Sequence, residues 1–124
     1  MFTEAIAVAD QGIEICPEEY RDYYQSRAAL IRNQIAWPLI DPDREDKNTD
    51  TVMALRLVRE ATEADPENWN IQDTFAWALF ANHMHEEAIA AAEQALELAP
   101  EEEKSEYEKA YLARLKAIVA EIQK

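Results

Sequence analysis

The sequence predicts an all-α protein, on three observations. Only one of the 124 residues is Gly and few are β-branched, whereas Ala, Glu and Leu are abundant, and this composition favours helices. Apolar residues recur at offsets that place them on one helix face. Three segments repeat one register, in which a small residue is followed at offsets of four, seven and twelve by an apolar residue, a small residue and Pro. They are Ala5 to Pro17, Ala54 to Pro66 and Ala88 to Pro100. The length suits a single domain.

Residues 1–16 form the first expected helix, and the first of the three closing prolines ends it. Its small residues, Gly12 among them, are expected to fill packing slots that let another helix approach closely. The segment resembles the second half of a helix pair without its first half. The chain is therefore expected to be cut from a longer array, with Phe2, Ile6 and Ile13 covered by something else.

Residues 17–66 form an expanded helix pair. Pro17 and Pro66 are 49 residues apart, fifteen more than the 34 that separate the next two prolines of the register. Alignment of Ile35-Ala36-Trp37 with Phe75-Ala76-Trp77 places nine extra residues before this motif and six after it. The sequence thus predicts a long first helix, from about Glu18 to Trp37, and a surface loop over 38–49 with two prolines and many charges. Thr49 or Asp50 is expected to cap the helix that follows.

Residues 67–100 form a regular helix pair. Asn68 is the expected cap of its first helix, and the turn around His83 separates this helix from the second, which ends at Leu98. Residues 101–124 form a terminal helix with a single apolar stripe. The stripe comprises Tyr107, Tyr111, Leu115, Ile118 and Ile122, with Glu108, Arg114, Lys116 and Glu121 off it.

The 34-residue spacing leads to a known family. In this period Phe75-Ala76 stands where the tetratricopeptide repeat has Leu-Gly, and Leu79 stands at its Tyr position. The chain therefore resembles the tetratricopeptide repeat family, with 101–124 similar to its capping helix. It departs from the pattern at three positions, with Gln72 for the first aromatic, Ala76 for Gly and Ala92 for Phe. The recurrence of Ala-Trp at 36–37 and 76–77 around a proline-rich loop resembles a bacterial subgroup whose repeats are often attached to larger proteins.

The resemblance implies a short α-solenoid of stacked antiparallel helix pairs, with the first helix of each pair lining a concave groove. The residues it places in this candidate partner-binding groove are Asn33, Trp37, Ile40, Asn70, Asp73, Trp77 and Phe80. Trp37 and Trp77 occupy equivalent positions. They are expected either to anchor a bound peptide, as Trp often does at interfaces, or to pack in the core, which is the commoner role in a small helical domain.

The best-known members of the family bind acidic C-terminal tails through Lys, Arg and Asn in these groove positions. Here the positions hold two amides, Asn33 and Asn70, and no Lys or Arg. An acidic tail would find no compensating cation there, so a basic or mixed peptide, helix or protein is the expected partner.

Charge and composition exclude several classes of partner. With 12 Lys and Arg against 26 Asp and Glu, the net charge is −14, which disfavours nucleic acid and anionic membranes. No apolar run approaches the length of a membrane span, and the N-terminus is unlike a secretory signal. The single cysteine, Cys16, is expected to be buried, and it favours a reducing compartment, the cytoplasm.

No catalytic, cofactor or metal site is expected. His83-x-His85 with the neighbouring Glu86 and Glu87 supplies too few positioned ligands for zinc, so these are expected to be solvated turn residues. A single Gly allows no phosphate-binding loop. The expected function is non-catalytic: a scaffold that binds a protein partner in the groove. Two alternatives are a regulatory or assembly module of a larger enzyme or signalling protein, and self-association as a homodimer through residues 1–16.

Overall fold

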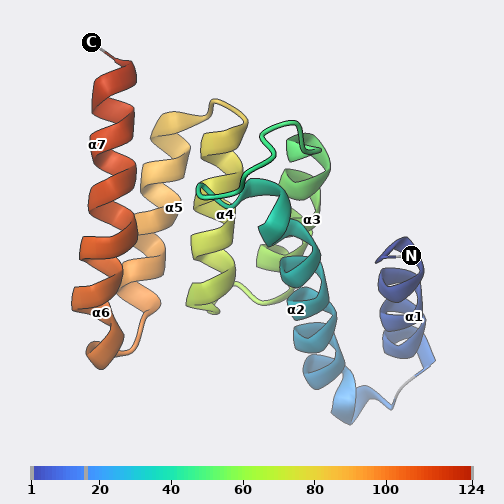
Figure 1. Ribbon diagram of the computed structural model, residues 1–124. Coiled ribbons are helices and arrows are strands. Elements are labelled where there is room, and N and C mark those ends of the chain that lie inside the picture. The colour runs from blue at the N-terminus through green and yellow to red at the C-terminus, as the bar shows by residue number, and fades with distance from the viewer. Residues whose placement is uncertain (1, 16, 124) are drawn as a thin grey trace.

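The computed structural model describes residues 2–15 and 17–123, and these form helices arranged side by side (Figure 1). The helices are α1 (Phe2–Ile15), a 3-10 turn η1 (Glu18–Tyr20), α2 (Arg21–Ile40), α3 (Thr51–Ala64), α4 (Trp69–Ala81), α5 (His85–Leu98), α6 (Glu101–Tyr107), a π-helical turn η2 (Glu108–Leu112) and α7 (Ala113–Ile122). No strand occurs in the described residues, which confirms the all-α prediction. Cys16 lies outside the described residues, as does the side chain of Phe2.

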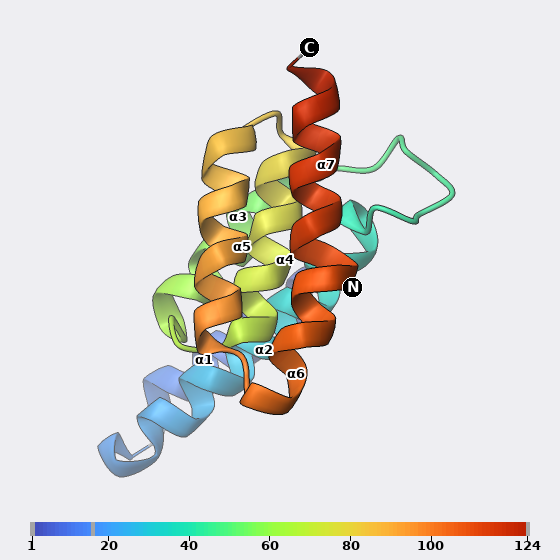
Figure 2. The ribbon, with the colours of Figure 1, turned by 90° about the vertical axis from the view of Figure 1, so that its left-hand side faces the viewer.

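Helices α1 to α5 alternate in direction, and α2 packs with α3 and α4 with α5 (Figure 1). Helix α4 is central, because it contacts α2, α3 and α5. Helix α1 packs on α2 at one end of the row. At the other end α6, η2 and α7 pack on α5. In Figure 2, with α7 in front, the loop between α2 and α3 extends to one side of the helices. None of the described helices is long and apolar enough to span a membrane.

The repeated small residues are core residues in two of the three segments. In α3, Ala54, Val58 and Ala61 are each 0% exposed, and the equivalent residues of α5, Ala88, Ala92 and Ala95, are no more than 2% exposed. In α1, by contrast, a Cβ added at Gly12 would meet no atom within 4 Å. The expectation that Gly12 fills a packing slot is therefore wrong, because no other helix of the described part of the chain packs there.

Two predicted caps are confirmed. The Asp50 carboxylate accepts the backbone N–H of Met53 at 2.9 Å, at the start of α3. The Asn68 side-chain oxygen accepts the N–H groups of Asn70 and Ile71 at 3.0 and 3.3 Å, at the start of α4. Both satisfy backbone donors that a helix N-terminus leaves free.

Helix α2 has about the expected length but is shifted along the chain: residues 18–20 form the separate turn η1, and α2 continues through Pro38 to Ile40, so the loop begins at residue 41. A proline inside a helix removes one backbone hydrogen bond, yet the last turn closes with a bond from Asp41 N to Trp37 O at 2.9 Å. The Thr49 hydroxyl donates to the carbonyl of Leu39 at 2.6 Å. Burial of Ile40, 1% exposed, offsets the cost of the proline.

The terminal helix buries a different stripe from the expected one. Its buried residues are Tyr107, Leu112, Leu115 and Val119, whereas Tyr111 is 36% exposed and Ile122 is 55% exposed. The π-helical turn η2 is the cause, since it adds one residue to a turn and rotates the following residues about the helix axis. The stripe therefore passes from Tyr107 to Leu112, five residues on.

Candidate functional site

The terminal helix covers much of the α4 face that the sequence assigns to a ligand. The Tyr107 hydroxyl donates a hydrogen bond to Asp73 at 3.0 Å, and its ring lies edge-on to that of Trp69, with centroids 5.6 Å apart. The Arg114 guanidinium lies over the Trp77 ring, 5.9 Å from its centroid. Trp77 is 1% exposed, so it packs in the core and offers no surface to a ligand.

Asp73 and Tyr107 form a pair of mutually perturbed groups. Burial raises the pKa of Asp73 to about 6, although hydrogen bonds from Tyr107 and Trp77 oppose this rise. The pKa of Tyr107 is also raised, first by its own burial and then by the charge of Asp73. The pair joins α4 to α6 inside the protein, where its role is structural.

The other predicted groove residues differ in exposure. Asn33 and Trp37 of α2 are half-buried, and Asn70 of α4 is exposed. The side-chain oxygen of Asn33 is buried and has no hydrogen-bond partner among the described residues. Two of the seven, Ile40 and Phe80, line a common cavity.

This cavity lies beside the 41–50 loop, which is fixed to the terminal helix. Arg114 donates two hydrogen bonds to the Asp43 carboxylate, at 2.8 and 3.3 Å, across 71 residues of chain. The hydrogen bonds between the two side chains lower the pKa of Asp43 and raise that of Arg114. The loop, the end of α2, α4 and α7 therefore form one wall around the cavity.

We call this space the loop cavity; it has a volume of about 260 Å³. Its lining combines apolar side chains, which we call its floor, with three cations, two from the loop and one from α7. Its lining is Ile40, Pro42, Arg44, Lys47, Phe80, Ala81, Arg114 and Ile118, with no carboxylate among them. The sequence-based groove residues do not include these cations, because the cations come from the loop and the terminal helix and the groove was assigned to the first helix of each pair. The presence of Arg44 and Lys47 in a wide loop was the feature of the sequence that could have indicated this site.

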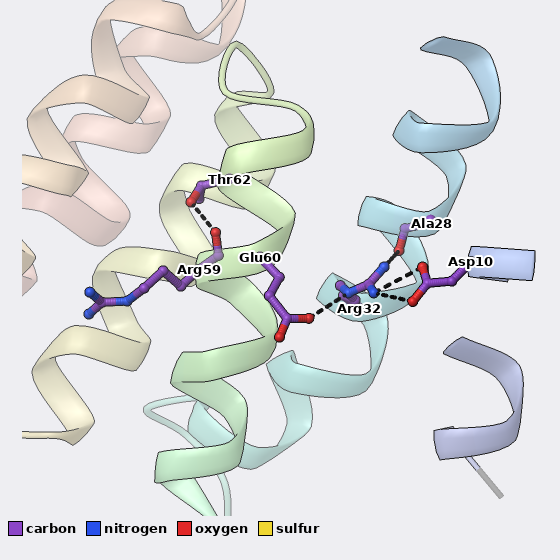
Figure 3. Close-up of polar contacts among 6 residues, drawn as sticks. All are labelled: Asp10, Ala28, Arg32, Arg59, Glu60 and Thr62. Carbon is purple, nitrogen blue, oxygen red and sulfur yellow. Dashed lines mark hydrogen bonds and ion pairs between the residues drawn. The ribbon is translucent and has the colours of Figure 1, made fainter. Parts of the chain in front are cut away.

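A second polar site links α1 to α2 and α3. Figure 3 shows Arg32 of α2 between Asp10 of α1 and Glu60 of α3. Its guanidinium donates to both Asp10 oxygens at 2.8 and 3.0 Å and to Glu60 at 3.0 Å, and its side chain is 12% exposed. Burial would lower the pKa of Arg32, but the two carboxylates raise it overall.

A cavity of about 290 Å³ adjoins Arg32, lined by Ile6, Asp10, Arg32, Met53, Arg56, Leu57 and Glu60. Its charges are already balanced, because two carboxylates face two guanidinium groups. Arg32 bonds to both carboxylates, so the polar groups here stabilise the position of α1.

The histidine turn holds two rings close together. His83 has a φ of 65°, in the left-handed region, and its ring centroid lies 6.1 Å from that of His85. The buried Nδ1 of His85 has no hydrogen-bond partner in the described part of the chain. Residues 2–15 and 17–123 contain no group of three or more His, Cys, Asp or Glu side chains placed to hold a metal ion.

Comparisons with models of protein families, with curated proteins and with solved structures found no match to this chain.

Proposed function

We propose that this chain is a tetratricopeptide-type interaction module that binds a short segment of another protein in the loop cavity and catalyses no reaction. The observation that carries the proposal is the composition of that cavity. An apolar floor and three cations meet there, in a protein whose net charge is −14. Such a local mixture of apolar and charged groups is typical of sites that recognise a partner. The single cysteine supports the cytoplasm as the place of action.

The proposed partner segment has a mixed composition and is not a polyacidic tail. An apolar side chain from the partner would cover the exposed parts of Phe80 and Ile118. A run of acidic residues would meet the repulsion of the whole protein, which carries 26 carboxylates against 12 Lys and Arg. Hydrogen bonds within the protein hold the loop beside the cavity in place, so binding requires little rearrangement.

The test is selection of a random 12-residue peptide library displayed on phage, with the folded chain as bait. Enriched peptides are then measured against two variants, Ile118→Asp in the floor of the loop cavity and Val52→Asp on α3. Val52 is 71% exposed and lies outside the loop cavity, so the second variant is the matched control. Binding should weaken by about tenfold or more with Ile118→Asp and stay unchanged with Val52→Asp. Equal binding by both variants, or no enriched peptide, contradicts the proposal.

Self-association through α1 is the second candidate, because this helix exposes large apolar side chains. Val8 is 67% exposed and Ile15 is 85% exposed, and the space beside Gly12 is open. Sedimentation equilibrium should then show dimers that Ile15→Glu abolishes. A protein that stays monomeric at every concentration up to about 1 mM would rule this out, because only dimers with a binding free energy weaker than about 4 kcal/mol would then escape detection.

A further inference from the structure

On the basis of the proposed function, we infer that the loop cavity receives one large apolar side chain of the partner together with one adjacent side-chain carboxylate. The juxtaposition of Arg44, Lys47 and Arg114 with an apolar floor carries this inference. It names the chemistry of the partner segment, which the proposed function leaves open.

Two of the three cations donate hydrogen bonds to uncharged oxygens. Arg44 donates to the Thr49 hydroxyl at 3.1 Å and to the carbonyl of Asp41 at 2.9 Å. The Lys47 ammonium donates to the carbonyl of Pro42 at 2.9 Å. A carboxylate from a partner would replace or join these neutral acceptors with a charge-assisted bond, which is the stronger kind.

The cations that line the cavity leave a place for one carboxylate. Arg114 is paired with Asp43, Lys47 also acts on Asp43 through its charge, and Asp41 acts on Arg114. None of these carboxylates lines the cavity, whose lining holds three cations and no acidic group. Glu45 and Asp46 are exposed in the same loop and would repel a second acidic group.

The floor suits an apolar side chain. Phe80 and Ile118 are half-buried and so keep surface for a contact, and Phe80 is held by an edge-on contact with Trp77, their centroids 5.8 Å apart. At about 260 Å³ the cavity lies below the range of about 300–1,000 Å³ typical of cofactor and drug-sized sites. One or two side chains fit it better than a whole cofactor. Because the bond between Arg114 and Asp43 fixes its wall, the site is preorganised.

The experiment is an NMR titration with blocked dipeptides, which carry no terminal charge. The probes are acetyl-Leu-Glu-amide, the neutral acetyl-Leu-Gln-amide and acetyl-Gly-Glu-amide, which lacks the apolar side chain. The Arg44 and Arg114 side-chain N–H signals and the Ile40 and Ile118 methyl signals report on the cavity. Acetyl-Leu-Glu-amide should give saturable shifts in both sets, with affinity about tenfold above that of each other probe.

Two variants test the assignment of the cations. The double variant Arg44→Gln/Lys47→Gln should lose the preference for Glu over Gln, whereas Lys116→Gln, which removes an α7 cation outside the loop cavity, should keep it. Equal binding of the Glu and Gln probes, a preference that survives the double variant, or no binding of any probe overturns the inference. So does an equal response to inorganic phosphate, which would indicate a simple anion site. If peptides selected from the library bind the Arg44→Gln/Lys47→Gln variant as tightly as the original chain, this inference is overturned while the proposed function stands.

Discussion

Tyr107 donates its hydroxyl hydrogen to Asp73 at 3.0 Å, and the two residues are 34 positions apart. This separation equals the distance in sequence between Pro66 and Pro100, so the two residues occupy equivalent positions in successive periods. The bond joins the central helix α4 to α6. The bond is partly buried, and Asp73 is ionisable near neutral pH, so the stability of the terminal helix depends on protonation.

The stability contributed by Asp73 should fall as pH rises. The pKa of Asp73 is about 6 in the folded chain against an ordinary value of 3.8, so between these values the folded state keeps a proton that the unfolded chain has lost. The contribution is therefore fully present below about pH 4 and is lost as pH rises through about 6, a change on the order of 2–3 kcal/mol. Asp73→Asn should remove this dependence.

Urea unfolding of the natural chain and of Asp73→Asn at pH 5 and pH 7.5 measures this effect. Because the other carboxylates titrate in both proteins, their difference isolates Asp73. The variant should gain about 1 kcal/mol relative to the natural chain between the two values. A difference that does not change with pH would show that Asp73 titrates normally.

Tyr107→Phe should destabilise the fold more at pH 7.5 than at pH 5. At the higher pH it leaves an ionised, buried Asp73 without its hydroxyl donor, at a cost of about 1–3 kcal/mol. At pH 5 the carboxyl group is mostly neutral and the cost is smaller. Combining the change with Asp73→Asn in a double-mutant cycle gives the coupling energy. Additive effects would contradict a direct interaction.

Loss of Arg32 should release α1 without unfolding the rest. Arg32→Met removes the contacts to Asp10 and Glu60, so hydrogen exchange in Phe2–Ile15 should become faster while exchange in α4 and α5 stays slow. Arg59→Met is the matched control on α3, because Arg59 points away from Arg32 (Figure 3). Equal exchange rates in both variants would indicate that apolar contacts alone hold α1.

Trp77→Ala should lower the free energy of unfolding by about 3–5 kcal/mol, because Trp77 is 1% exposed. Trp37→Ala should lower the free energy of unfolding by less, because Trp37 is half-buried. Urea unfolding followed by circular dichroism compares the two. In a variant with Phe at positions 37 and 69, the remaining Trp77 fluorescence should be blue-shifted. A red-shifted spectrum with a small stability loss would place Trp77 in a solvated groove after all.

Local signals in the sequence predicted much of the fold. The caps at Asp50 and Asn68, the long helix before the loop and the small residues of α3 and α5 depend on neighbours within a few positions, and all are found. The end of α2 was misplaced because burial of Ile40 outweighs the helix-breaking tendency of Pro38.

The features that the sequence did not predict depend on contacts between segments far apart in the chain. A stripe with α-helical spacing gives no sign of a π-helical turn, so the exposure of Tyr111 and Ile122 was unforeseen. The loop cavity needs Arg114 beside residues 71 positions earlier, a proximity that only the packed structure provides. Gly12 was expected to be a packing residue because the equivalent residues Ala61 and Ala95 are buried, but none of the described residues packs against Gly12.

The extra residue of η2 also decides where Arg114 points. Removing it would turn every later position by about 100°, which would carry Arg114 away from both Asp43 and the Trp77 ring. The wide loop would then lose its tie to α7. The loop between α2 and α3 and the extra residue of η2 thus act together to place Asp43 beside Arg114. A change in the length of either should break this contact.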